Sequence, residues 1–217
     1  MPNERPNGAA WQDSLAGGLR KVPVQARSRA TVKAVLDAAA ELVEELGFEA
    51  VVESPTLILD RSGVSRGSFY SFFETPERVL DQLAYQQILQ FVAGIEKRFR
   101  SREGAGWRGV IDVLVDYYLE VYAQPLIREL WVRQNITSRV RHLDEAAIED
   151  IAELLRLELI ASSDGPQHVD HIQCVVAVHA LERLCQFAFA NDPHGDQEVI
   201  GEARELLVAY FSRRPSA

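Results

Sequence analysis

A short stretch of the sequence, GVSRGSFYSFF at 63–73, combines side chains that can bind DNA with aromatic side chains that favour burial. Ser65 and Ser68 offer hydroxyl groups, and the start of a helix adds backbone N–H groups that attract phosphate. Arg66 adds a guanidinium group, which can donate hydrogen bonds to phosphates or to guanine. The chemistry indicated is that of a polar helix start that can approach a DNA duplex closely.

A helix over 65–72 would divide this stretch between two faces. The inward face carries Val64, Phe69 and Phe73, and the outward face carries Arg66, Gly67 and Tyr70. Gly67 costs helix stability, roughly 1 kcal/mol relative to alanine. That cost is understandable if a side chain there would collide with a DNA backbone or with a neighbouring helix.

The elements around this stretch are predicted to be helices throughout. Apolar residues spaced for one helix face run from Val32 to Leu46, and Gly47 ends that helix. Ser54-Pro55 starts a second helix and Thr75-Pro76 a fourth, so 54–73 forms a helix-turn-helix, with an ordinary helical hairpin as the alternative. Further helices are expected at about 110–122, 125–136, 142–161, 168–190 and 196–212. With no alternating strand pattern, the fold class is all-α.

The composition narrows the class of protein. The 217 residues are 47% hydrophobic without a membrane-length apolar run, and the N-terminus does not resemble a secretory signal. The two cysteines lie in apolar helical patterns, so we expect a cytoplasmic protein without disulfides. The net charge of −9 argues against indiscriminate nucleic-acid binding. Residues 20–35, however, carry five Lys and Arg and no acidic residue, as a phosphate-binding arm or a solvated basic tail would.

The segment from Arg29 to about Leu83 resembles the N-terminal domain of the tetracycline-repressor (TetR) family. The matching pieces are AVLDAAAELVEELGF, LILDRSGVSRGSFYSFF and TPERVLDQLA. The sequence departs from the family at Pro76, at Phe72 and in the longer lead-in GFEAVVESP. The resemblance implies a DNA-binding domain at 21–78 and a ligand-binding and dimerisation domain at 79–217, after an extension at 1–20 that is expected to lack fixed structure. The DNA contacts expected are Arg29, Lys33, Ser54, Thr56, Ser65, Arg66, Gly67, Ser68 and Tyr70.

Aromatic and polar residues of the C-terminal region suggest a small-molecule pocket, and ordinary core packing is the alternative. The ligand-binding candidates are Trp107, Tyr118, Tyr122, Arg128, Trp131 and His179. His168 and His171 are spaced for a metal on one helix face, but a solvated helix start is the preferred reading. We expect no metal and no cofactor.

The last two predicted helices carry apolar stripes broader than one chain needs for its core, with full burial inside one chain as the alternative. The dimerisation candidates are Leu181, Leu184, Leu206, Leu207, Tyr210 and Phe211. The sequence therefore predicts a homodimeric, ligand-responsive regulator, most simply a repressor, bound to a near-palindromic DNA operator and modulated by a small apolar effector. The alternative is a small-molecule-binding protein or enzyme with a non-functional DNA-binding head. No phosphate loop, nucleophile elbow or zinc motif supports an enzyme.

Overall fold

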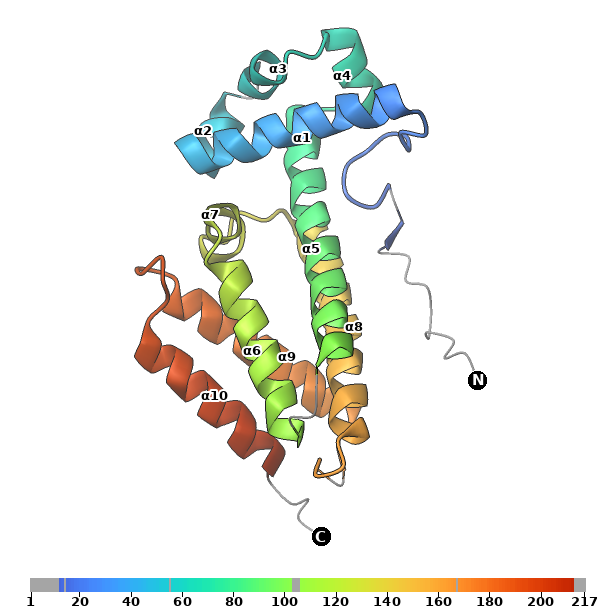
Figure 1. Ribbon diagram of the computed structural model, residues 1–217. Coiled ribbons are helices and arrows are strands. Elements are labelled where there is room, and N and C mark those ends of the chain that lie inside the picture. Colours follow the sequence, from blue (N-terminus) through green and yellow to red (C-terminus); the bar gives the residue numbers. More distant parts are fainter. Residues whose placement is uncertain (1–11, 14, 55, 103–105, 167, 213–217) are drawn as a thin grey trace. The chain divides into compact units, whose positions relative to one another are not determined.

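The computed structural model describes residues 12–13, 15–54, 56–102, 106–166 and 168–212, and helices dominate them (Figure 1). The chain divides into two compact units. The N-terminal unit runs to Leu89 and includes Gln134–Ala146, and the C-terminal unit contains Gln90–Arg133 and the chain from Ala147 onward. Helices α5 and α8 each continue from one unit into the other. No helix in the described residues is long and apolar enough to span a membrane.

The N-terminal unit is built around α1 (Ala26–Leu46), which contacts α2 (Phe48–Glu53), α3 (Thr56–Ser62) and α4 (Arg66–Phe72). The buried face of α1 has the spacing seen in the sequence and carries Val32, Val35, Leu36, Ala38, Ala39, Leu42 and Val43. Gly47 ends the helix with φ 85°, and its N–H donates to the Val43 carbonyl at 3.0 Å. The predicted C-terminal cap is therefore confirmed.

Two details of the N-terminal unit differ from the sequence prediction. Helix α1 begins at Ala26, earlier than the apolar pattern alone indicated, and the lead-in GFEAVVESP contains the short helix α2. Val51 of α2 is buried, which explains how the extra residues are accommodated. Ser54 is the C-terminal cap of α2, and its carbonyl accepts from the Leu57 N–H at 3.0 Å.

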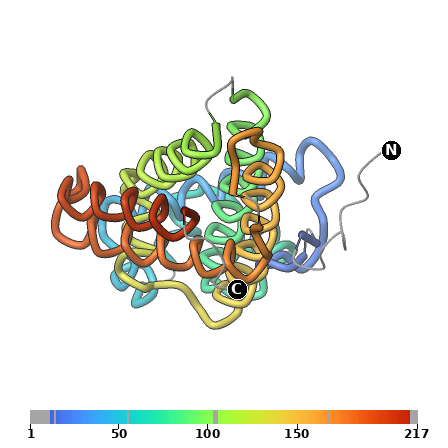
Figure 2. Tube along the Cα trace, turned by 90° about the horizontal axis from the view of Figure 1, so that it is seen from below, coloured from blue at the N-terminus to red at the C-terminus, as the bar shows by residue number. Residues whose placement is uncertain are grey.

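The C-terminal unit contains α6 (Gly106–Tyr122), α9 (His171–Ala188) and α10 (Gln197–Ser212), which pack against one another, together with parts of α5 (Pro76–Ser101) and α8 (Ser138–Ala161) (Figure 2). The helix expected at 125–136 is instead a short α7 (Pro125–Ile127) that continues as the π-helix η2 (Arg128–Val132). Gln134 follows with φ 59°, a left-handed backbone that ends the helical run.

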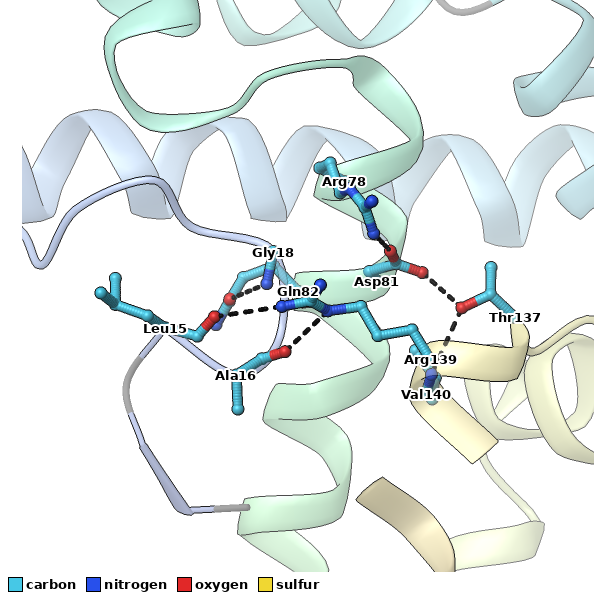
Figure 3. Close-up of polar contacts among 9 residues, drawn as sticks. All are labelled: Leu15, Ala16, Gly18, Arg78, Asp81, Gln82, Thr137, Arg139 and Val140. Carbon is cyan, nitrogen blue, oxygen red and sulfur yellow. Dashed lines mark hydrogen bonds and ion pairs between the residues drawn. The ribbon is translucent and has the colours of Figure 1, made fainter. Parts of the chain in front are cut away.

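The boundary between the units falls later than the expected one at residue 78. Val79, Leu80, Leu83 and Ala84 of α5 are buried, and the N-terminal unit extends along α5 to Leu89. The carboxylate of Asp81, itself 3% exposed, accepts from Arg78 at 2.8 Å and from the Thr137 hydroxyl at 2.6 Å (Figure 3). Thr137 also caps α8 by accepting the Val140 N–H at 3.3 Å. This buried polar cluster explains why residues 134–146 belong to the N-terminal unit.

Candidate functional site

Helix α4 begins with an exposed, polar first turn. Ser65 is its N-terminal cap, and its Oγ accepts from the Ser68 N–H at 3.3 Å. The Ser65 hydroxyl lies 2.9 Å from the Ser68 hydroxyl, and both side chains are exposed. Arg66 is exposed at the first helical position. The structure therefore presents the hydroxyl and guanidinium groups singled out in the sequence on one accessible helix end.

The other end of α4 anchors the helix in the core. Phe69 is 1% exposed and Phe73 0%, with ring centroids 5.7 Å apart. Phe72, one of the departures from the family pattern, is also buried, and the Lys21 ammonium lies 4.9 Å from its ring centroid. Tyr70 remains 45% exposed and meets Phe69 edge to face. A helix of seven residues would not be stable alone, so this burial holds the polar end in place.

Gly67 lies on the exposed side of α4 with open space around it. A Cβ atom built there would meet no atom of the described chain within 4 Å. Within the described residues, no neighbouring helix is close enough to explain why position 67 is a glycine. Close approach of an external molecule remains as the reason for having no side chain at this position.

We expect Gly67→Ala to separate stability from DNA binding. The alanine should raise the free energy of unfolding by up to about 1 kcal/mol, because it replaces a helical glycine without a clash. The same methyl group should weaken DNA binding by obstructing the approach of the duplex. Denaturant unfolding and DNA titration of the same preparation measure the two effects, and Gly201→Ala, in open space on α10, is the matched control. Unchanged DNA affinity in a stabilised variant would contradict this role.

The remaining DNA-contact candidates lie on α1 and at the junction of α2 and α3. Ser54, which caps α2, and Thr56, the first residue of α3, are both exposed. Arg29 of α1 donates to the Val24 carbonyl at 2.5 Å, which fixes the chain entering that helix. Lys33 is exposed and pairs with Asp37 at 2.6 Å. Such an exposed pair contributes little stability, so Lys33 can exchange its partner for a phosphate at small cost.

An ion pair connects α3 to α1. The Arg61 guanidinium donates to both carboxylate oxygens of Glu45, at 2.8 and 3.0 Å, and lies 3.5 Å from Glu41. The hydrogen bonds from Arg61 lower the pKa of the Glu45 carboxyl below its usual value. This contact orients the helix before the turn, and the turn itself uses Gly63 at φ 63°.

The C-terminal unit buries a row of aromatic rings. Phe91 lies 4.7 Å from Tyr118, Tyr118 stacks 6.1 Å from Tyr122, and Tyr122 lies 6.2 Å from Phe189, measured between ring centroids. Trp107 and Trp131 are buried as well. The sequence reading missed Glu182 of α9, whose carboxylate accepts from the Tyr122 hydroxyl at 3.4 Å. Only the fold brings it to Tyr122, so no local signal identifies it.

A shallow apolar crevice between α6, α9 and α10 has no room for a water molecule. It is lined by Val115, Leu119, Leu181, Leu184, Cys185, Ala188, Val199, Ile200 and Ala203. None of the six ligand-binding candidates lines this crevice. Arg128 is half-buried and donates to the Ala123 carbonyl instead. His179 is exposed on α9, which corrects the expectation of a pocket histidine.

The dimerisation candidates divide between the interior and the surface. Leu181, Leu207 and Phe211 are at most 5% exposed within the chain, so their expected contact with a second copy is corrected. Leu184 and Tyr210 are half-buried, and Leu206 is 48% exposed. Three apolar residues that were not candidates face outward on α9, namely Ile172 at 64%, Val176 at 47% and Phe187 at 66% exposed. We call these three residues and Leu206 the α9–α10 face.

The surroundings of His171 and of the two cysteines indicate structural roles. His171 lies 2.6 Å from Glu149 and 3.4 Å from Glu153, joining α9 to α8. Cys174 and Cys185 are free and buried, and burial raises the pKa of each thiol to about 12. Both thiols are therefore neutral at physiological pH and poor nucleophiles.

These observations define a helix-turn-helix protein with a separate helical C-terminal unit, the architecture of a DNA-binding regulator. Residues 105–214 match the model of the tetracyclin repressor-like C-terminal domain. The chain is also similar to a TetR-family transcriptional regulator from Streptomyces coelicolor, with 30% identity and a TM-score of 0.64 over 83% of this chain and 96% of the other. The protein belongs to the TetR family of transcriptional regulators.

Two further solved structures share the fold at lower identity. One is the transcriptional regulator FadR from Bacillus subtilis in complex with stearoyl-CoA, at 18% identity and a TM-score of 0.62 over 83% of this chain and 97% of the other. The second is the fatty acid degradation regulator FadR from Bacillus halodurans, at 18% identity and a TM-score of 0.57 over 86% and 99%. Comparison with curated proteins gave no significant match.

Proposed function

We propose that the protein is a homodimeric transcriptional repressor, without enzymatic activity, that binds a near-palindromic operator and is released by a small apolar molecule. The observation that carries the proposal is the exposed first turn of α4, held outward by the buried Phe69 and Phe73 and left open at Gly67. The polar groups of that turn would contact bases and phosphates, and Tyr70 would contact the backbone.

The dimer is supported by the α9–α10 face. Several exposed large apolar side chains on one side of a helix are unusual in a monomer, and Ile172, Val176 and Phe187, 47–66% exposed, lie on one side of α9. Two copies of this face can pack as a four-helix bundle by a two-fold axis. The same axis would relate two α4 helices, so each copy would contact one half-site of the operator.

An apolar effector is supported by the interior of the C-terminal unit. The aromatic row and the crevice both offer apolar surface, and the hydrogen-bonded pair of Tyr122 and Glu182 adds polar groups to the same unit. The crevice has no room even for a water molecule, so an effector would have to separate α6, α9 and α10 to create a pocket of the usual size, roughly 300–1,000 Å³. The fold shared with a FadR that holds stearoyl-CoA makes long-chain acyl-CoA the first effector class to test.

Selection of bound fragments from random duplex DNA should recover a near-palindromic site, and its affinity should fall as salt rises. Stearoyl-CoA and shorter acyl-CoAs are then added to the complex. We expect a long-chain member to raise the melting temperature of the protein and to lower its operator affinity, since coupling between two sites is reciprocal.

Each part of the proposal can fail separately. If the protein binds no duplex at low salt, the repressor proposal is wrong. That result would favour a small-molecule-binding protein with a non-functional DNA-binding head. A compound that stabilises the protein without changing operator affinity would show that its site is not regulatory. Tighter operator binding in the presence of the compound would show that the compound acts as a corepressor and does not release the protein from DNA.

A further inference from the structure

Residues 13 and 15–21, which we call the strap, contact α5 and the start of α8. The Tyr85 hydroxyl donates to the Asp13 carbonyl at 2.9 Å, and the Arg139 guanidinium donates to the Ala16 carbonyl at 2.8 Å. The Gly18 N–H donates to the buried Gln82 side chain at 2.9 Å (Figure 3). The expectation that residues 1–20 lack fixed structure is therefore corrected for residues 12, 13 and 15–20, whereas residues 1–11 and 14 lie outside the described residues.

Two glycines allow the strap to approach α5 closely. A Cβ atom at Gly18 would lie 2.1 Å from the Arg78 carbonyl oxygen, and one at Gly17 would lie 2.5 Å from Gln82 Oε1. Both glycines are buried. A backbone oxygen cannot move aside as a flexible side chain can, so a larger residue at position 18 would lift the strap. The contact is thus specific to this pair of glycines.

The far end of the strap meets the C-terminal end of α4. Arg20 donates its N–H to the Phe72 carbonyl at 2.8 Å and its guanidinium to the Tyr70 carbonyl at 3.1 Å. Leu19 pairs with Phe73 as an isolated bridge. Lys21 lies over the Phe72 ring, and both cationic side chains are exposed. The strap therefore places Arg20 at the Tyr70 carbonyl and Lys21 over Phe72, both at the end of the helix that carries Tyr70, a candidate phosphate contact.

We propose that the strap is a positioning element that holds Arg20 and Lys21 for contact with DNA phosphates at the end of α4; this rests on the DNA binding proposed above. A cation on a disordered arm loses backbone and side-chain freedom when it binds, whereas one fixed beforehand loses less. No acidic residue lies between Arg20 and Val35 in the sequence. Gly17, Gly18 and Arg139 act through this placement, and none of them needs to touch DNA.

The test uses the full-length chain and one selected duplex, titrated over a series of salt concentrations. Arg20→Gln should lower affinity about tenfold at low salt and reduce the salt slope by about one, as the loss of one phosphate contact does. Gly18→Ala should produce a similar loss without removing any charge. Gly201→Ala, which places the same methyl group in open space on α10, should change neither quantity.

Arg139→Ala releases the strap at its other anchor and avoids the close contact at Gly18. We expect it to reduce both affinity and salt slope, in the same direction as Gly18→Ala. Adding Arg20→Gln to Gly18→Ala should then cost little more, because the two changes remove the same contact.

The possible outcomes distinguish failure of the strap proposal from failure of the DNA-binding function on which it rests. If wild-type protein binds no DNA, the repressor proposal fails and the strap fails with it. If wild type binds and Gly18→Ala and Arg139→Ala both keep its salt slope, the strap does not position phosphate contacts, whatever its effect on stability. Full additivity of Gly18→Ala and Arg20→Gln would likewise overturn the proposal.

Discussion

Replacing Phe187 by glutamate should convert the proposed dimer to a monomer. Phe187 is 66% exposed on the same side of α9 as Val176 and Ile172, and burying an unpaired carboxylate at an apolar interface is strongly unfavourable. A monomer binds only one half-site, so affinity for the two-half-site operator should fall by roughly 10²–10⁴-fold, the usual gain from linking two binding modules. Light scattering at micromolar concentration and operator titration measure the two effects.

The matched control for this substitution is Ile160→Glu. Ile160 is 52% exposed on α8, so the same change of apolar side chain to carboxylate is made outside the α9–α10 face. This variant should remain dimeric and bind the operator as wild type does. A Phe187→Glu protein that stays dimeric would place the interface elsewhere, and a monomeric wild type at high concentration would remove the bundle altogether.

Helix α4 could be predicted from the sequence because the residues that determine it lie close together in the chain. The Ser65 cap, the turn at Gly63 and the burial of Phe69 and Phe73 depend on residues within a few positions of one another. The structure agrees because nothing from outside this stretch competes with its capping and amphipathic pattern. The missed helix α2 is also local, but its six residues are too few for a periodic signal.

The strap and the α9–α10 face could not be predicted because their determinants are far apart in the chain. A polar, glycine-rich segment has the composition of a disordered one, and only Arg78 and Gln82, more than 50 residues later, show that Gly17 and Gly18 are packing residues. On α9, apolar residues occur on both the inner and the outer side, so the sequence does not reveal that Leu181 is buried and Phe187 exposed. Packing against α6 and α10 determines which side of α9 is buried.

Arg66→Ala should weaken binding to the best operator by about 1–3 kcal/mol and relax the preference at one base position in each half-site. Arg66 is exposed at the first position of α4, and the open space at Gly67 beside it allows the guanidinium to reach a base edge. A base contact differs from a phosphate contact in its dependence on sequence. The loss should therefore be large on the selected site and small on unrelated duplexes.

Two comparisons show whether Arg66 reads bases. Lys33→Ala, at a candidate phosphate contact on α1, should weaken binding uniformly across sequences and reduce the salt slope by about one. Arg108→Ala removes an exposed arginine of the C-terminal unit and should leave both properties unchanged. Repeating the fragment selection with Arg66→Ala gives the decisive measurement. If the variant recovers the wild-type site with its preference intact, Arg66 contacts the backbone, and base recognition must come from Ser65, Ser68 or the shape of the duplex.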